Sequence, residues 1–204
     1  MKQERKRLFI DKETDAKERQ RIIETAAEKK YNTLVFSLDD KFFKSKNRKL
    51  KYIKLINQHS FFIEAGGRDF SLLLPRRLFF FHRDLFRMEE GKRKASHHFC
   101  PTKPQTTAII AKRAYALFAR AMREVTAPRI FHLFPDKGYE TTWCACPACR
   151  AFSPAEQNII AVNTAADALF KLDPDARLSY HDFGIEPGEG GVAPRKNTFC
   201  LRAK

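Results

Sequence analysis

The sequence predicts an α/β fold of the (β/α)8 TIM-barrel-like class, incomplete and built from about six β/α units. Two observations lead to this prediction. Short apolar runs alternate with amphipathic stretches along the chain, which is typical of a mostly parallel sheet covered by helices. The chain has 204 residues, whereas eight such units usually need about 250 residues. An open doubly wound sheet fits the same alternation.

Six apolar runs have the length of buried strands, and polar or turn-forming residues bound them. The runs predicted as strands are residues 33–38, 61–65, 96–100, 129–134, 177–182 and 198–201. Residues 72–86 are rich in Leu and Phe around Pro75, and we expect short helical turns there.

Four stretches between these runs have helical periodicity or helix-starting residues. The four helices are predicted over residues 11–30, over residues 48–58, after Thr102 and after Ser153. Thr102 and Ser153 each begin a capping-box pattern, and the one at Ser153 is the stronger because Pro follows it. The first helix belongs to a charged N-terminal segment, residues 1–30. A TIM-barrel-like domain, expected to be truncated at its C-terminal end, covers residues 31–204.

The charge of the chain is strongly positive, with 39 Lys and Arg against 24 Asp and Glu, a net +15. Seven basic residues and no acid lie between Lys41 and Lys54, either as a phosphate-binding stripe or as a solvated helix face. We favour the solvated face, and nucleic acid is not expected as a partner, because no zinc-finger spacing or aromatic RNA-binding pattern accompanies the charge.

Neither a membrane span nor a secretory signal is evident, because no apolar run reaches about 18 residues and no apolar stretch follows the basic start. We therefore expect no membrane association and a cytoplasmic protein as written. Secretion stays open if the chain is a fragment.

Polar residues cluster where the predicted strands end, which is where parallel α/β folds bind ligands. The candidate residues are Asp39, Asp40, Glu64, Arg68, Asp69, His132, Asp136, His181 and Asp182. Several carboxylates at one edge suit glycosidic hydrolysis, since one protonates the leaving oxygen and another stabilises or attacks the sugar centre. Each acid taken singly could instead be a helix cap or a solvated loop carboxylate.

Two further candidates have equally open readings. Arg68 could hold an anionic sugar substituent such as a uronate, or could bridge Asp69 or Glu64. Trp143, the single Trp of the chain, could stack on a sugar ring or pack its own loop.

Three cysteines, Cys144, Cys146 and Cys149, lie within six residues of one another between a predicted strand and a predicted helix. Three thiolates this close can share one tetrahedral ion, and a structural zinc site needs a fourth ligand. Cys100 is the expected fourth ligand, with the neighbouring His97 or His98 as substitutes. Free thiols, a disulfide and a redox pair are the alternatives.

Several short motifs resemble a known family. They are EAGG at 64–67, SLLLPR at 71–76, FCPT at 99–102, FHLFPD at 131–136, WCxCPxCR at 143–150 and SPxxQ at 153–157. Together they resemble a bacterial domain-of-unknown-function family of TIM-barrel glycoside-hydrolase-like proteins, which is related to alpha-glucuronidases and hexosaminidases. The resemblance covers residues 32–201 approximately.

This resemblance implies a catalytic domain that acts on carbohydrate, with Asp136 as the acid. We expect Glu64 or Asp182 as its partner, and Asp39, Asp40, Arg68, Asp69, His132, Trp143 and His181 along the sugar site. The family's members are longer and often carry a His after the Gly-Gly pair, where this chain has Arg68. A partner chain or an oligomer is therefore expected to complete the barrel. The alternative is a non-catalytic, metal-stapled basic module that binds carbohydrate or nucleic acid.

Overall fold

The structure, a computed structural model, describes residues 4–11, 13–44, 46–123, 128–138, 142–181 and 191–201. Six strands of this part form one sheet in the order β1-β2-β3-β6-β7-β8, and every neighbouring pair is parallel. The strands are β1 (Arg7–Ile10), β2 (Thr33–Phe36), β3 (Phe62–Gly67), β6 (Ile130–Leu133), β7 (Arg177–Tyr180) and β8 (Thr198–Cys200). The predicted α/β class with six alternating strands is confirmed.

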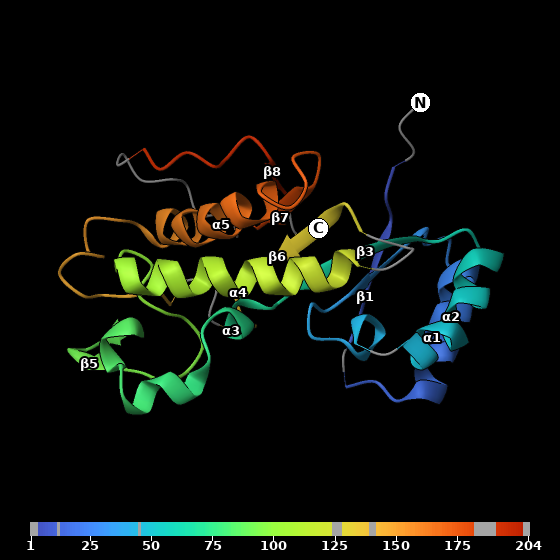
Figure 1. Cartoon of the computed structure of the whole chain (residues 1–204), viewed down its shortest axis with the longest axis horizontal. Helices are drawn as coiled ribbons and strands as arrows, with labels where there is room; N and C mark the ends of the chain where they lie inside the picture. Colours follow the sequence, from blue (N-terminus) through green and yellow to red (C-terminus); the bar gives the residue numbers. More distant parts are fainter. Residues whose placement is uncertain are drawn as a thin grey trace.

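Helices connect these strands and lie in groups around the sheet. The α-helices are α1 (Ala16–Glu28), α2 (Lys46–Gln58), α3 (Phe70–Leu73), α4 (Pro104–Met122) and α5 (Pro154–Phe170), and the 3-10 turns are η1 (Lys41–Phe43), η2 (Arg76–Phe80) and η3 (Arg83–Leu85). Figure 1 shows α4 and α5 side by side, with α1 and α2 together at the opposite end of the sheet. A short hairpin, β4 (Met88–Glu89) with β5 (Lys92–Arg93), lies apart from the main sheet.

Local hydrogen bonds explain where the helices begin. Asp15 caps α1 by accepting from the backbone N–H groups of the first turn. The Ser153 hydroxyl accepts from the Glu156 N–H while the Glu156 carboxylate accepts from the Ser153 N–H, so the predicted capping box of α5 is confirmed. The predicted box at Thr102 is wrong, because α4 begins at Pro104 after Lys103, which makes no side-chain cap.

Two strand predictions need correction. Residues 96–100 do not join the main sheet: His97 has a positive φ of 62°, which turns the chain, and only Phe99 makes an isolated bridge, to Phe86. In its place, β1 pairs with β2 along Arg7 to Ile10, so part of the segment before residue 31 belongs to the sheet. Only four residues long and preceded by a charged run, β1 has little periodicity by which to recognise it.

Gly66 allows β3 and β6 to approach closely at the middle of the sheet. It lies opposite His132 in the register, and its φ of +117° suits glycine. A Cβ built on Gly66 would lie 1.9 Å from the His132 carbonyl oxygen, a backbone atom that cannot rotate away. A residue with a side chain at position 66 therefore requires the two strands to separate.

We expect Gly66→Ala to lower the free energy of unfolding by more than about 4 kcal/mol, in the range of the most disruptive single substitutions. Gly91→Ala is the matched control, because Gly91 also has a positive φ, +75°, but has no neighbouring atom within 4 Å of a built Cβ. Its expected loss is about 1–2 kcal/mol, from backbone strain alone. Urea denaturation of both variants measures the difference, and equal losses would contradict the steric argument.

Candidate functional site

A cavity of about 560 Å³ opens at the carboxyl ends of the parallel strands. The ends of β1, β2, β3, β6 and β7 all contribute to its wall, the edge at which barrel enzymes bind their substrates. Its lining residues are Phe9, Ile10, Asp11, Ser37, Gly66, Gly67, Arg68, Asp69, Phe134 and His181. Three predicted substrate-site residues, Arg68, Asp69 and His181, are therefore brought together in one cavity.

Hydrogen bonds between loops fix two of these residues. The buried Asp69 carboxylate accepts from the Ser37 hydroxyl at 2.7 Å and from the Leu38 N–H at 2.8 Å, which joins the loops after β2 and β3. Arg68 donates to the Pro135 carbonyl at 3.1 Å and so joins the loops after β3 and β6. These bonds hold three neighbouring loops in place around the cavity.

Asp136, the predicted acid, follows two residues after Phe134 of the cavity wall. One of its carboxylate oxygens lies 3.4 Å from Nδ1 of His97, and 18% of its side chain is exposed. Asp182, its predicted partner, lies outside the described residues, directly after His181. Asp136 is thus a half-buried carboxylate beside the cavity rather than in its lining.

Glu64, the other predicted partner, occupies a different position. It is completely buried, and its carboxylate accepts from Arg7 Nε at 2.6 Å and contacts His132 Nε2 at 2.7 Å. Arg5 adds a longer contact at 3.4 Å, and His132 Nδ1 lies 2.6 Å from the Ser179 hydroxyl. This network joins β3, β6 and β7 to Arg7 of β1 inside the sheet, so neither Glu64 nor His132 lines the cavity.

Burial and hydrogen bonding set the charges of this network. Burial raises the pKa of Glu64, but the hydrogen bonds from His132 and Arg7 outweigh it and hold the pKa below its usual value. Burial lowers the pKa of His132 more than Glu64 raises it. With His132 neutral, its Nε2–H donates to Glu64 and its Nδ1 accepts from the Ser179 hydroxyl.

The predicted roles of Asp40 and Trp143 in substrate binding are not supported. Asp40 is buried, forms two hydrogen bonds of 2.7 and 2.9 Å with Arg19 and caps η1, which is the structural alternative open to any such acid. Trp143 is 6% exposed, and the His98 ring covers its face at 4.4 Å. Asp39 contacts Lys44 and lies outside the cavity lining.

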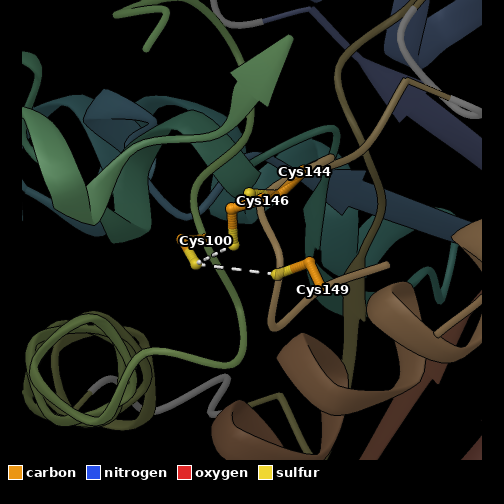
Figure 2. A group of neighbouring side chains, drawn as sticks. All are labelled: Cys100, Cys144, Cys146 and Cys149. Carbon is orange, nitrogen blue, oxygen red and sulfur yellow. Dashed lines mark hydrogen bonds between the residues drawn. The ribbon is translucent and has the colours of Figure 1, made fainter. Parts of the chain in front are cut away.

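The four cysteines of the predicted metal site converge. All four are buried and unbonded, and their sulfur atoms lie within 4.8 Å of one another. Figure 2 shows Cys144, Cys146 and Cys149 of one loop facing Cys100 of a neighbouring segment. The sulfur of Cys100 lies 3.7 Å from that of Cys146 and 3.6 Å from that of Cys149. Zinc–sulfur bonds of about 2.3 Å in a tetrahedron require separations of about 3.8 Å, so the cluster suits a metal such as zinc.

Hydrogen bonds within the cluster bias its protonation. Those from Cys144 and Cys149 hold the pKa of the Cys100 thiol well below its usual range, whereas the bond to Cys100 raises the pKa of Cys144 to about 11. The Met88 N–H donates to the Cys144 sulfur at 3.3 Å, and the Thr102 hydroxyl lies 3.1 Å from that of Cys149. Polar hydrogens directed at sulfur stabilise thiolates, the form that binds metal.

Gln157 of α5 supports the cysteine loop and was not predicted to do so. Its side-chain amide accepts from the Cys144 N–H at 3.1 Å and donates to the Cys144 and Cys149 carbonyls at 3.1 and 3.2 Å. The capping box that begins α5 at Ser153 places this side chain one turn into the helix, under the loop. Only its place in the SPxxQ motif signals this role in the sequence.

Comparisons with known proteins place this geometry in a fold class. The chain matches no protein-family model and no curated protein. Among solved structures, it is similar to a GH20 catalytic module of the pneumococcal exo-beta-D-N-acetylglucosaminidase StrH, with a TM-score of 0.62 and 13% identity. The match covers 96% of this chain and 58% of that one. The protein therefore has the TIM-barrel-type fold of glycoside hydrolase catalytic domains over 58% of that chain's length.

A weaker structural match is the GH36 alpha-galactosidase AgaA from Geobacillus stearothermophilus, with a TM-score of 0.48 and 11% identity, over 83% of this chain and 26% of that one. Within the residues that the structure describes, no helix combines the length and apolar character needed to cross a membrane.

We expect Glu64→Gln to lower the free energy of unfolding at pH 7 by about 3–5 kcal/mol, because Arg7 and His132 then lose a buried charged partner. Asp167→Asn is the control: it breaks the Arg195–Asp167 pair, whose side chains are 54% and 50% exposed, and should change stability by less than about 1 kcal/mol. Urea unfolding measures both variants.

The pH dependence provides a second test of the same network. The lowered pKa of Glu64 stabilises the fold above its unfolded value of 4.5, and this stabilisation is lost as the pH falls through the folded pKa. The lowered pKa of His132 likewise makes stability fall as the pH drops below 6.5, since only the unfolded chain then takes up the proton. Glu64→Gln should therefore have a flatter stability profile below pH 4.5 than the parent chain. A parallel profile would contradict this charge assignment.

Proposed function

We propose that the protein is a glycoside-hydrolase-like, carbohydrate-active protein that binds a sugar in the cavity at the carboxyl ends of its strands. The observation that carries this proposal is the cavity itself, to which five parallel strands contribute both aromatic rings and polar groups. Phe9 and Phe134 offer apolar ring surface to a sugar, while Asp11, Asp69 and His181 offer hydrogen-bonding groups. A partner chain or second copy that completes the barrel is part of this proposal.

In the catalytic form of this proposal, Asp136 is the general acid that protonates the glycosidic oxygen. A second carboxylate then stabilises or attacks the oxocarbenium-like centre. We assign that role to Asp182 rather than Glu64, because Asp182 follows the cavity residue His181 whereas Arg7 and His132 already hold the Glu64 carboxylate. The contact with His97 supports Asp136 as the acid, since it orients the carboxyl group.

The charge of the cavity favours an anionic sugar. Arg68 lines the wall, and its guanidinium can pair with a carboxylate in a bidentate manner. The net charge of +15 adds a general attraction for anionic ligands. We therefore propose a uronate-containing glycoside as the substrate class.

A non-catalytic carbohydrate-binding module is the second candidate function. Three acids at the strand ends support it: Asp40 and Glu64 are paired with arginines, and Asp69 is held by backbone and hydroxyl donors. A cavity whose acids serve the fold can bind a sugar without cleaving it. Hydrolysis and binding must therefore be measured separately.

Asp136→Asn tests the catalytic assignment on chromogenic glycosides, including glucuronides. We expect kcat/KM to fall at least about 100-fold, the usual contribution of a general acid, with sugar binding retained in calorimetry. Asp175→Asn, a change to an exposed acid beyond α5, serves as the control and should leave the rate unchanged. An unchanged rate in Asp136→Asn would remove Asp136 from the mechanism. Binding without turnover in the parent chain would favour the module, and binding that weakens steeply between about 50 and 200 mM salt would indicate a phosphate-rich ligand instead.

We also propose that the four-cysteine cluster binds a structural zinc ion. Four thiolates suit Zn²⁺, and a closed site of this kind adds the binding energy to the stability of the fold. In elemental analysis of the reduced chain, we expect about one zinc per molecule. Cys149→Ser should lose the metal, while Cys200→Ser, a change to an exposed thiol outside the cluster, should keep it. A reduced, folded chain without metal would contradict the proposal, and a red, iron-containing chain would reassign the ion.

A further inference from the structure

The metal cluster joins the same two segments that meet at Asp136. The first segment, residues 96–102, carries Cys100, and the second is the loop between β6 and α5, which carries the other three cysteines. The described parts of these segments meet at three successive points. They are the cysteine cluster, the ring stack of His98 on Trp143, and the contact of His97 with Asp136.

The ring stack carries the constraint from the cysteines toward the acid. His98 and Trp143 are parallel to within 1° at 4.4 Å, and both are buried. Trp143 is adjacent to Cys144, and His98 lies two residues from Cys100. Phe70 of α3 packs edge-on against both rings, at 6.0 and 5.8 Å. A buried aromatic stack therefore continues directly from the cysteine cluster.

His97 is held by its backbone as well as by its side chain. Its φ of 62° is uncommon for a residue other than glycine, and Arg76 donates to its carbonyl oxygen. This conformation directs Nδ1 toward the Asp136 carboxylate at 3.4 Å. Such strain persists only where the surroundings impose it, and the segment is fixed three residues further on by Cys100.

We propose that the metal centre positions Asp136: by fixing residues 96–102 against the loop after β6, it holds His97 on the Asp136 carboxylate. His97 is then a positioning residue and not a catalytic one. The consequence for carbohydrate chemistry rests on the proposed function, but the coupling between the metal and the acid does not.

Hydrogen exchange of the zinc-loaded and the chelated full chain tests the coupling without any sugar. On chelation, we expect amide exchange to rise at least about tenfold both in residues 96–99 and in residues 134–138. The middle of α4, residues 110–118, is the internal reference and should remain protected. A rise confined to residues 142–150 would overturn the proposal, because the metal would then order only its own loop.

A second arm applies even if chelation unfolds the whole chain. In the zinc-loaded protein, His97→Ala should keep its metal but raise exchange in residues 134–138, and His97→Asn, whose amide can replace Nδ1, should restore protection. His82→Ala, a change to an exposed histidine after η2, is the control and should alter neither region. Unchanged exchange in His97→Ala would overturn the role of His97. If the chain hydrolyses glycosides, His97→Ala should lower kcat more than it changes KM.

Discussion

A carboxylate buried inside a sheet must be matched by charged or hydrogen-bonding partners, and Glu64 imposes this constraint on the centre of the molecule. Arg7 brings β1 to the network, His132 brings β6, and Ser179 brings β7. The close approach of β3 and β6 at Gly66, one step beyond Ala65, then lets the ends of these strands surround one cavity. The polar interior therefore determines the geometry of the edge at which a ligand would bind.

Much of the fold could be predicted because its signals are local. Periodicity identified five of the six strands of the sheet, and a capping box identified the start of α5. Two errors arose where tertiary contacts decide the outcome. β1 is stable because β2 pairs with it, and residues 96–100 are apolar because they pack beneath loops rather than because they form a sheet strand.

The candidate site was predictable to a different degree in its two parts. The cysteine cluster could be found, including distant Cys100, because few residue types bind metal through sulfur. The acids could not be sorted, since a sequence does not reveal which carboxylate an arginine will neutralise. Arg19 and Arg7, which claim Asp40 and Glu64, lie 21 and 57 residues from their partners. Only the folded chain separates these structural acids from Asp136.

The convergence of the four cysteines also has a consequence for handling the protein. Without a metal, four thiols remain within 4.8 Å of one another, so a shift of less than about 2 Å brings a pair to the 2.05 Å of a sulfur–sulfur bond. Air oxidation of metal-free chains would then cross-link the loop in several alternative pairings, with Cys200 available for bonds between molecules. Purification under reductant with added zinc keeps one uniform species, whereas stored apo-protein becomes a mixture.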